Sequence, residues 1–367
     1  MKLLISSYFF HPTPGGISTS TFLLAREFTK QGHEVRIITT STCLREEALG
    51  VGLVIRAPSW LELRRQIAWS DAVLSIHLSV RLTWPLLIHR RPWVVAHHSW
   101  LTEVDGSIGW VEKIKHRLVR AASCISVSQA VAKHVGGNSV VIGPPHDDAM
   151  FRVTPEVSRQ RDLLFVGRLV SSKGVEVLLG AMDELRRGGS TAELTVVGDG
   201  PEFPALKEKV RTLELGERVH FAGPLAGAAL RDVFCSHRVL IVPSVKPETF
   251  GIVAVEAIAC GCVVVGSDAA GGLADAIGPC GPSFKNGDAH ALAGCLESLL
   301  SHPEKLEAYR VHADRHVAQF TADSVARRYL HVVEQEVTRK RAGSSRAPFL
   351  GKPARPTPRM AQALPRD

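Results

Sequence analysis

The feature that most constrains the fold is an alternation of strand-like and helical patterns that runs twice along the chain. In the first half, short apolar and β-branched runs alternate with amphipathic helical patterns. Strands separated by helices form a parallel sheet that is covered on both faces, so the pattern predicts an α/β fold. The predicted strands are Lys2–Ser7, Glu34–Thr39, Gly52–Ile55, Ala72–Ile76, Trp93–His97, Cys124–Val127 and Ser139–Ile142.

The same alternation restarts after a polar linker that opens at Pro144-Pro145 and reaches about Gln160. It continues to Val337 through the predicted strands Asp162–Val166, Glu193–Val197, Val219–Phe221, Val239–Val242 and Val263–Gly266. We therefore expect two tandem Rossmann-like domains, residues 1–157 and residues 158–338, the second including the C-terminal helices. A length of 367 residues fits two domains. The expected ligand site is the cleft between them, at the carboxyl ends of the strands.

The net charge of +8 is concentrated at the C-terminus. Residues 339–367 hold eight basic residues and one acid, which leaves +1 for the rest of the chain. This tail is rich in Pro, Ser and Ala and has little to bury, so we predict that it is disordered. The basic excess therefore does not indicate a nucleic-acid-binding fold. The tail could touch anionic lipid head groups, or it could be a solvated end.

The seven cysteines favour a cytoplasmic protein. Their number is odd and none forms a Cys-x-x-Cys pair, so a disulfide framework is not expected. Met1–Ser7 is a short strand-like run that stops at His11-Pro12, unlike a signal peptide. No apolar run reaches the roughly 18 residues that a bilayer crossing needs.

Two carboxylates with seven residues between them stand in the stretch that follows the strand Val239–Val242. Glu248 lies in a short loop, just before a predicted helix Phe250–Ala259 whose first N–H groups lack intrahelical partners. Glu256 stands about two turns into that helix, which is otherwise apolar. A carboxylate there is costly unless something hydrogen-bonds it. A polyhydroxylated ligand along this helix would satisfy both acids; the alternative is a capping acid and one satisfied buried Glu.

Two stretches could bind phosphate. Arg168 and Lys173 follow the first strand of the second domain and precede a helix, so they could converge on a diphosphate; a pair of surface cations is the alternative. Gly15 and Gly16 join the first strand to the first helix, whose N-terminus favours an anion. This Gly-Gly turn meets neither the dinucleotide fingerprint nor the P-loop pattern.

The sequence offers no metal site. It contains no Asp-x-Asp and no His/Cys cluster with metal-ligand spacing. If a sugar diphosphate leaves here, cations and helix dipoles must neutralise it. We therefore expect no metal and no other cofactor beyond the nucleotide-sugar co-substrate.

Histidines and glycines follow other strands at the same expected edge. His97 and His98 stand at the carboxyl end of the strand Trp93–His97, where a His could hydrogen-bond sugar hydroxyls or hold a developing charge; a satisfied loop histidine is the alternative. Val197-Gly198-Asp199-Gly200-Pro201 reads as mainly structural, with Pro early in a helix. The Gly271-Gly272 pair could admit a phosphate or sugar closely.

Together these residues resemble the retaining, glycogen-synthase-like nucleotide-sugar glycosyltransferases of GT-B fold, the group 1 or family 4 type. The resemblance covers about residues 1–330. Its most specific part is Glu248-x₇-Glu256 within Pro-Glu-Thr-Phe-Gly. Gly-Arg-Leu-x₃-Lys-Gly from Gly167, Val-Gly-Asp-Gly-Pro from Val197 and the early Gly-Gly support it.

The resemblance implies a role for each of these residues. Glu248 would hold donor-sugar hydroxyls, and His98, or His97 by one register step, would be the active-site histidine. Glu256 would take the ribose hydroxyls. The remaining donor contacts would be Gly15, Gly16, Arg168, Lys173, Leu225 near the base, and the backbone amides of Phe250, Gly251, Ile252 and Val253. Anomeric configuration would be retained, with the departing phosphate oxygen taking the acceptor proton.

Two departures from the family pattern are visible, and a third region is one that varies within the family. Pro144-Pro145 stands where the family often has Asn-Gly, and Asp275 stands where it usually has Glu. Thr102–Arg120, which would shape the acceptor site, carries a basic stretch that could face a lipid phosphate or form a solvated helix face.

The sequence thus predicts a cytoplasmic, metal-independent, retaining glycosyltransferase that uses a UDP- or GDP-sugar. The acceptor would be a saccharide, either free or linked to a lipid. The reaction would take part in polysaccharide or cell-envelope glycan assembly at the inner membrane face. A nucleotide-sugar epimerase and a non-catalytic nucleotide-sugar-binding subunit are the alternatives. No nucleic-acid partner is expected.

Overall fold

The structure of the protein is a computed structural model that describes residues 1–13, 15–42, 50–101, 109–119, 122–136, 139–269 and 271–343. Part of the predicted acceptor-shaping region, Thr102–Arg120, lies outside these residues, namely 102–108 and 120. So does the predicted tail from residue 344 onward. Its first residues, Arg339 to Arg341, are the last turn of a helix, so the tail boundary was placed too early.

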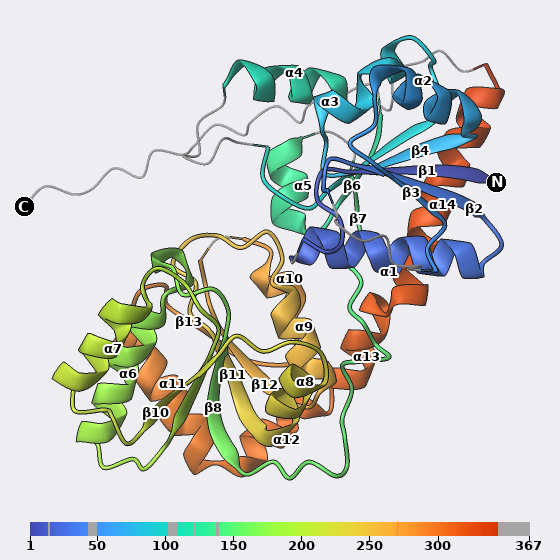
Figure 1. The fold of residues 1–367 in the computed structure, drawn as a ribbon. Helices are drawn as coiled ribbons and strands as arrows, with labels where there is room; N and C mark the ends of the chain where they lie inside the picture. Colours follow the sequence, from blue (N-terminus) through green and yellow to red (C-terminus); the bar gives the residue numbers. More distant parts are fainter. Residues whose placement is uncertain are drawn as a thin grey trace, which may run out of the picture.

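The first domain is built on a seven-stranded parallel sheet, shown in blue to green in Figure 1. The strands run in the order β3-β2-β1-β4-β5-β6-β7. They are β1 (Lys2–Ser7), β2 (Glu34–Thr39), β3 (Leu53–Arg56), β4 (Ala72–Ile76), β5 (Trp93–His97), β6 (Ser123–Ser126) and β7 (Ser139–Val141). The helical segments of this domain are α1 (Gly16–Lys30), α2 (Trp60–Trp69), α3 (Val80–Thr83), η1 (Trp84–Leu87), α4 (Trp110–Val119) and α5 (Gln129–Val135).

The second domain repeats this plan with a six-stranded parallel sheet in the order β10-β9-β8-β11-β12-β13. Its strands are β8 (Arg161–Val166), β9 (Leu194–Val197), β10 (Val219–Gly223), β11 (His237–Val242), β12 (Val263–Ser267) and β13 (Ser283–Phe284). Its helical segments are η2 (Ser171–Lys173), α6 (Val175–Arg187), α7 (Phe203–Thr212), α8 (Gly227–Ser236), α9 (Ile252–Ala259), α10 (Leu273–Ile277), α11 (Ala289–Ser301), α12 (Pro303–Arg310), α13 (Ala313–Val317) and η3 (Ala318–Phe320). The predicted α/β class with two tandem Rossmann-like domains is confirmed.

The central strands are apolar because both of their faces are covered. Val239, Leu240 and Ile241 of β11 are at most 1% exposed, which explains a continuous apolar run in place of an alternating one.

The last helix, α14 (Ala322–Arg341), returns to the first domain. Its residues Val325 and Tyr329 are fully buried in one core with Leu3 and Ile5 of β1. Figure 1 shows this helix in red beside the first sheet. The sequence assigned it to the second domain because it follows that sheet in the chain, whereas its apolar face packs on the first.

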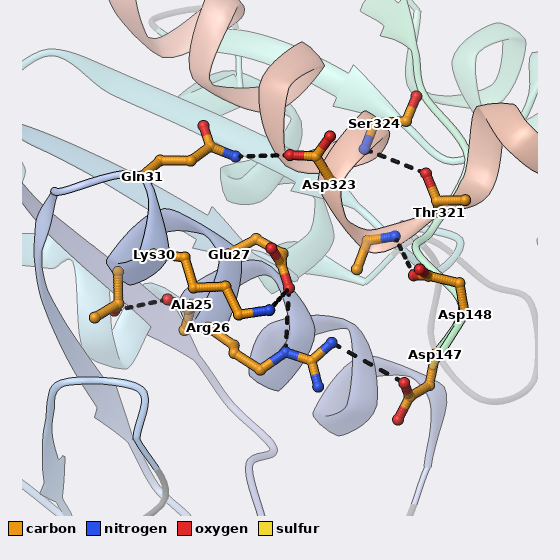
Figure 2. Close-up of polar contacts among 12 residues, drawn as sticks. Ala25, Arg26, Glu27, Lys30, Gln31, Asp147, Asp148, Thr321, Asp323 and Ser324 are labelled. Atoms are coloured by element: carbon orange, nitrogen blue, oxygen red, sulfur yellow. Dashed lines mark hydrogen bonds and ion pairs between the residues drawn. The ribbon is translucent and has the colours of Figure 1, made fainter. Parts of the chain in front are cut away.

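The chain crosses between the domains twice, and the two crossings are joined. The His146 and Phe320 backbones are hydrogen-bonded at 2.9 Å, and Asp148 Oδ1 accepts the Ala322 N–H at the start of α14, also at 2.9 Å. Figure 2 shows the Asp148 contact beside α1, where Arg26 pairs with Asp147 at 4.0 Å. The two links between the domains therefore meet at one place, beside α1.

Candidate active site

A cleft of about 610 Å³ lies between the domains, within the usual range for small-molecule sites. It is lined by every predicted site residue except Leu225. These residues are Gly15, Gly16, His98, Arg168, Lys173, Glu248, Phe250, Gly251, Ile252, Val253 and Glu256. Leu225 lies in the β10–α8 connection, where it packs partly buried against the core.

The second-domain wall is built where the strand order reverses, between β8 and β11. The loops after these two strands are joined, since the Val245 N–H donates to the Ser172 carbonyl at 3.0 Å. Gly174 makes this possible: its φ is +69°, and a Cβ there would lie 1.9 Å from the Pro243 carbonyl oxygen. The junction holds Lys173 and Glu248 face to face.

Glu248 is held by two hydrogen bonds to the same carboxylate oxygen. Lys173 Nζ donates to Oε1 at 2.5 Å, and Ser244 Oγ donates to it at 2.6 Å. The Glu248 side chain is 19% exposed and the Lys173 side chain 33%, so both reach the cleft. Arg168 is exposed and makes no ion pair with a described residue, which leaves its guanidinium open to an anion.

Glu256 reaches the cleft from the second turn of α9. The helix begins at Ile252, two residues later than predicted, because Gly251 takes a left-handed N-cap conformation with φ +96° and no side chain caps its amides. Burial, and then the nearby Asp147 carboxylate, raise the pKa of Glu256 to about 8. Near neutral pH, Glu256 can therefore both donate and accept hydrogen bonds.

The first-domain wall contains the start of α1. Gly15 and Gly16 stand there with nothing within 4 Å of an added Cβ at either position. The helix has no side-chain cap and no acidic residue in its first turn. Its first amides therefore remain available to an anion in the cleft.

The structure brings His98, rather than His97, to the cleft wall. His98 is 8% exposed and its Nε2 lies 3.3 Å from the Tyr329 hydroxyl. Burial, with smaller contributions from His77 and His97, lowers the pKa of His98 to about 3, so its ring is neutral at physiological pH. His77 was not predicted, although its place after β4 was a usable signal; its Nδ1 lies 2.7 Å from Ser99 Oγ.

The other glycine stretches pack against the backbone of the loops that form the cleft. Gly198 and Gly200 pack on the backbone of Gly167 and Leu169, which agrees with a structural role. Gly271 and Gly272 differ from the expectation of ligand contact. An added Cβ at Gly271 would lie 2.6 Å from the Glu248 carbonyl oxygen, so this pair packs against the loop that carries Glu248.

Asp275 joins the two domains directly. Its Oδ2 accepts the backbone N–H of Gln129 at 2.7 Å, at the start of α5 in the first domain. An acid of the second domain thus caps a helix of the first, a contact that the sequence could not indicate because 146 residues separate the partners.

Comparison with known proteins shows which family the chain resembles. Residues 147–316 match the family model described as glycosyl transferases group 1. The second domain is therefore similar to this family. A segment of 178 residues is 36% identical to D-inositol 3-phosphate glycosyltransferase of Rhodococcus erythropolis, covering 45% of the chain and 40% of that relative. The chain thus spans about two fifths of the length of the first relatives that it matches.

Relatives that match over more of the chain have a lower sequence identity to it. The phosphatidyl-myo-inositol mannosyltransferase of Propionibacterium freudenreichii is 28% identical over 326 residues, covering 82% of this chain and 80% of the relative. Among solved structures, Anabaena Alr3699/HepE in complex with UDP superposes with a TM-score of 0.76 at 18% identity, covering 91% and 100% of the two chains. The fold of this chain is therefore the GT-B fold.

Within the described residues, no three His, Cys, Asp or Glu side chains are grouped so that they could hold a metal ion. None of the described helices has both the length and the apolar character needed to cross a bilayer. The six described cysteines are all free.

Proposed function

We propose that this protein is a retaining, metal-independent glycosyltransferase that uses a nucleoside-diphosphate sugar. The observation that carries the proposal is the set of groups in one cleft. Glu248, Glu256, Lys173 and Arg168 of the second domain face the uncapped start of α1 in the first. Both walls offer groups that bind anions, and the second-domain wall adds acids that can bind hydroxyls. This combination suits a sugar joined to a diphosphate better than a ligand that contacts one domain alone.

Each group has a part in this proposal. The pyrophosphate lies between the α1 N-terminus and the Arg168/Lys173 pair. These two cations stabilise the leaving group more strongly as it gains negative charge. The Lys173 ammonium has three N–H donors, so it can keep Glu248 while it binds a phosphate oxygen. Glu248 then orients the sugar hydroxyls, and Glu256 the ribose. These cationic groups make a metal unnecessary for charge neutralisation.

We assign the donor to the UDP-sugars first, since the similar Anabaena structure was solved with UDP. The acceptor is a saccharide, lipid-linked in our proposal, in the assembly of a polysaccharide or cell-envelope glycan at the inner membrane face. The inositol-lipid name of the Propionibacterium relative supports a lipid-linked acceptor. Free, buried cysteines support a cytoplasmic location.

The test is a panel of UDP- and GDP-sugars incubated with the full chain, with and without EDTA, in the presence and absence of lipid and saccharide extracts. We expect nucleoside diphosphate release that survives EDTA and rises with one extract, with the α-anomer of the donor kept in the product. Complete loss with EDTA would contradict metal independence. A new nucleotide sugar formed without acceptor would identify an epimerase, and binding without any turnover would identify a non-catalytic subunit.

A further inference from the structure

A tyrosine of the last helix reaches the cleft histidine from inside the first domain. Tyr329 of α14 is fully buried, and its hydroxyl oxygen lies 3.3 Å from Nε2 of His98. His98 follows directly after β5 and lines the cleft. The two residues are 231 positions apart in the chain. Their contact therefore joins the cleft wall to the core behind it.

The phenol ring of Tyr329 is held by the packing around it. It lies in one apolar core with Ile76 of β4 and Ala96 of β5, both of which are fully buried. The helix that carries it packs against α1 as well as against these strands. A side chain whose rotamer is locked by packing can hold a neighbouring site residue in one geometry. The Tyr329 hydroxyl is thus a fixed point for the His98 ring.

Both partners are uncharged at physiological pH. Burial, and then the neighbouring His77 and His97, hold the pKa of His98 at about 3. Burial raises the pKa of the Tyr329 hydroxyl above its ordinary value. A neutral imidazole has one N–H donor and one acceptor nitrogen, and the partner of one nitrogen decides which of the two carries the proton. Tyr329 can therefore set the tautomer of His98.

The Tyr329 hydroxyl favours one of the two tautomers. Within the part of the chain that the structure describes, His98 is its only hydrogen-bond partner. If Nε2 carried the ring proton, it would donate to the phenol oxygen, and the phenol proton would stay buried without an acceptor. A buried donor without a partner is costly. Donation from the hydroxyl to Nε2 satisfies both atoms and places the ring proton on Nδ1.

The second ring nitrogen of His98 is left for the cleft. Nδ1 makes no hydrogen bond with a described residue, and it is not one of the enclosed polar atoms that lack a partner. It is therefore open to the cleft that His98 lines. An N–H there can donate to a sugar oxygen, whereas the Glu248 carboxylate on the facing domain can only accept. The two walls would then offer complementary partners to one sugar.

We infer that Tyr329 is a positioning residue of the active site: its hydroxyl donates to Nε2 of His98 and thereby holds an Nδ1–H donor toward an oxygen of the bound sugar. The sugar part of the inference rests on the proposed function. The tautomer is a property of the unliganded protein. The last helix thus contributes to the site through a residue that does not touch the ligand.

Nitrogen NMR measures the tautomer on the full chain with ¹⁵N-labelled histidine rings. The protonated and unprotonated nitrogens of a neutral imidazole differ widely in chemical shift, and His98→Gln assigns the His98 signals by their loss. We expect Nδ1 to be protonated in the native protein. Tyr329→Phe keeps the packing but offers no hydroxyl, so the Nε2–H form should appear. Tyr309→Phe, which removes a partly buried phenol hydroxyl from α12 of the second domain, is the matched control and should leave the His98 signals unchanged.

Two results would overturn the inference in this arm. One is an Nε2–H tautomer in the native protein, a measurement that does not depend on the stability of any variant. The other is an unchanged Nδ1–H tautomer in Tyr329→Phe.

Kinetics test the sugar part of the inference. Tyr329→Phe should lower kcat with the donor about 10-fold, as the loss of an outer partner of a metal-bound histidine does, with UDP affinity within about two-fold. His98→Asn keeps an amide near the place of Nδ1 that does not depend on Tyr329. In this background Tyr329→Phe should have no further effect on kcat. A further loss of about 10-fold in the double variant would assign the effect to packing and overturn the positioning role.

The two arms separate this inference from the proposed function. A tautomer change in Tyr329→Phe, without transfer from any donor by the native protein, would leave the Tyr329–His98 hydrogen bond standing and remove the transferase. Transfer with equal kcat in the native protein and in Tyr329→Phe would remove the positioning role and leave the transferase standing.

Discussion

Lys173 Nζ lies 2.5 Å from Glu248 Oε1 in the cleft, across the junction of the two loops that follow β8 and β11. The pair is only partly exposed, and Ser244 Oγ donates to the same carboxylate oxygen at 2.6 Å. The acid that is proposed to hold the sugar and the cation proposed to hold the pyrophosphate are therefore one unit. Changing either member should affect sugar positioning through the other.

Glu248→Gln should remove the ion pair but keep the shape of the side chain. We expect kcat/KM for the donor to fall about 10²–10³-fold, as when one positioned polar group is lost from an active site. The UDP affinity should stay within about three-fold because the nucleotide does not contact the sugar-binding acid. Isothermal titration with UDP and initial rates with the donor measure the two effects.

The matched control is Glu176→Gln. Glu176 pairs with Lys209 at the same 2.5 Å, on the surface of the same domain and outside the cleft lining. Exposed pairs contribute about 0–1 kcal/mol, so this variant should keep both rate and affinity. Equal rates for the two variants would remove Glu248 from the site.

Glu256 should make the stability of the unliganded protein depend on pH. Its folded pKa is about 8 against an ordinary value of 4.5, so between these values the folded state keeps a proton that the unfolded state has lost. Stability must then fall as pH rises from about 4.5 to about 8. Melting temperatures measured across this range should show the fall, and Glu256→Gln, which cannot ionise, should flatten it. An identical slope in that variant would assign the pH dependence to other groups.

The same residue should matter for the nucleotide. Glu256→Ala removes the hydrogen-bonding group and should weaken UDP binding about 10-fold or more, while Glu256→Gln should bind more tightly than Glu256→Ala. The UDP-induced rise in melting temperature reports the difference, since a ligand of the folded state raises apparent stability. The exposed Glu217→Ala is the control and should leave the rise unchanged.

The sequence was a good guide wherever local chemistry decides the outcome. Apolar runs such as Val239–Val242 predicted β11, and the Glu248/Glu256 spacing and the strand-end position of Arg168 predicted one cavity wall. Position after a strand worked because the carboxyl ends of parallel strands share an edge.

It was a poor guide to contacts between distant segments. The α14 sequence has one apolar face, which could pack on either domain. Only the folded chain shows that Tyr329 packs on the first domain. Likewise, Gly271-Gly272 reads as a ligand-binding turn in the sequence. In the structure the pair fits the backbone of the Glu248 loop, a close approach that no local signal encodes.

Asp275 should govern how the domains are held together. Its carboxylate caps the α5 N-terminus across the interface, at 2.7 Å from the Gln129 nitrogen. Asp275→Ala removes a capping bond, typically worth about 0.5–2 kcal/mol. This bond exists only while the two domains are in contact, so its loss favours their separation. We expect a larger radius of gyration by small-angle scattering and a several-fold higher donor KM. Asp288→Ala, which removes a cap within the second domain at Ala291, should lower the melting temperature without changing the radius.

Gly272→Ala should disable the site by packing alone. The Gly272 backbone has φ −86° and ψ 0°, which alanine also adopts, so the variant carries no backbone strain. The added Cβ would lie 2.1 Å from the Thr249 carbonyl oxygen and 2.6 Å from Ser128 Cβ of the first domain. The Glu248 loop or the domain contact must therefore shift, and we expect donor turnover to fall at least about 10-fold, because a displacement of about 1 Å can cost 10²-fold.

The control is Gly294→Ala in the middle of α11, where nothing lies within 4 Å and alanine should stabilise the helix by about 0.5–1 kcal/mol. Full activity in Gly272→Ala, measured beside a normal melting temperature, would show that the cleft does not need this close approach.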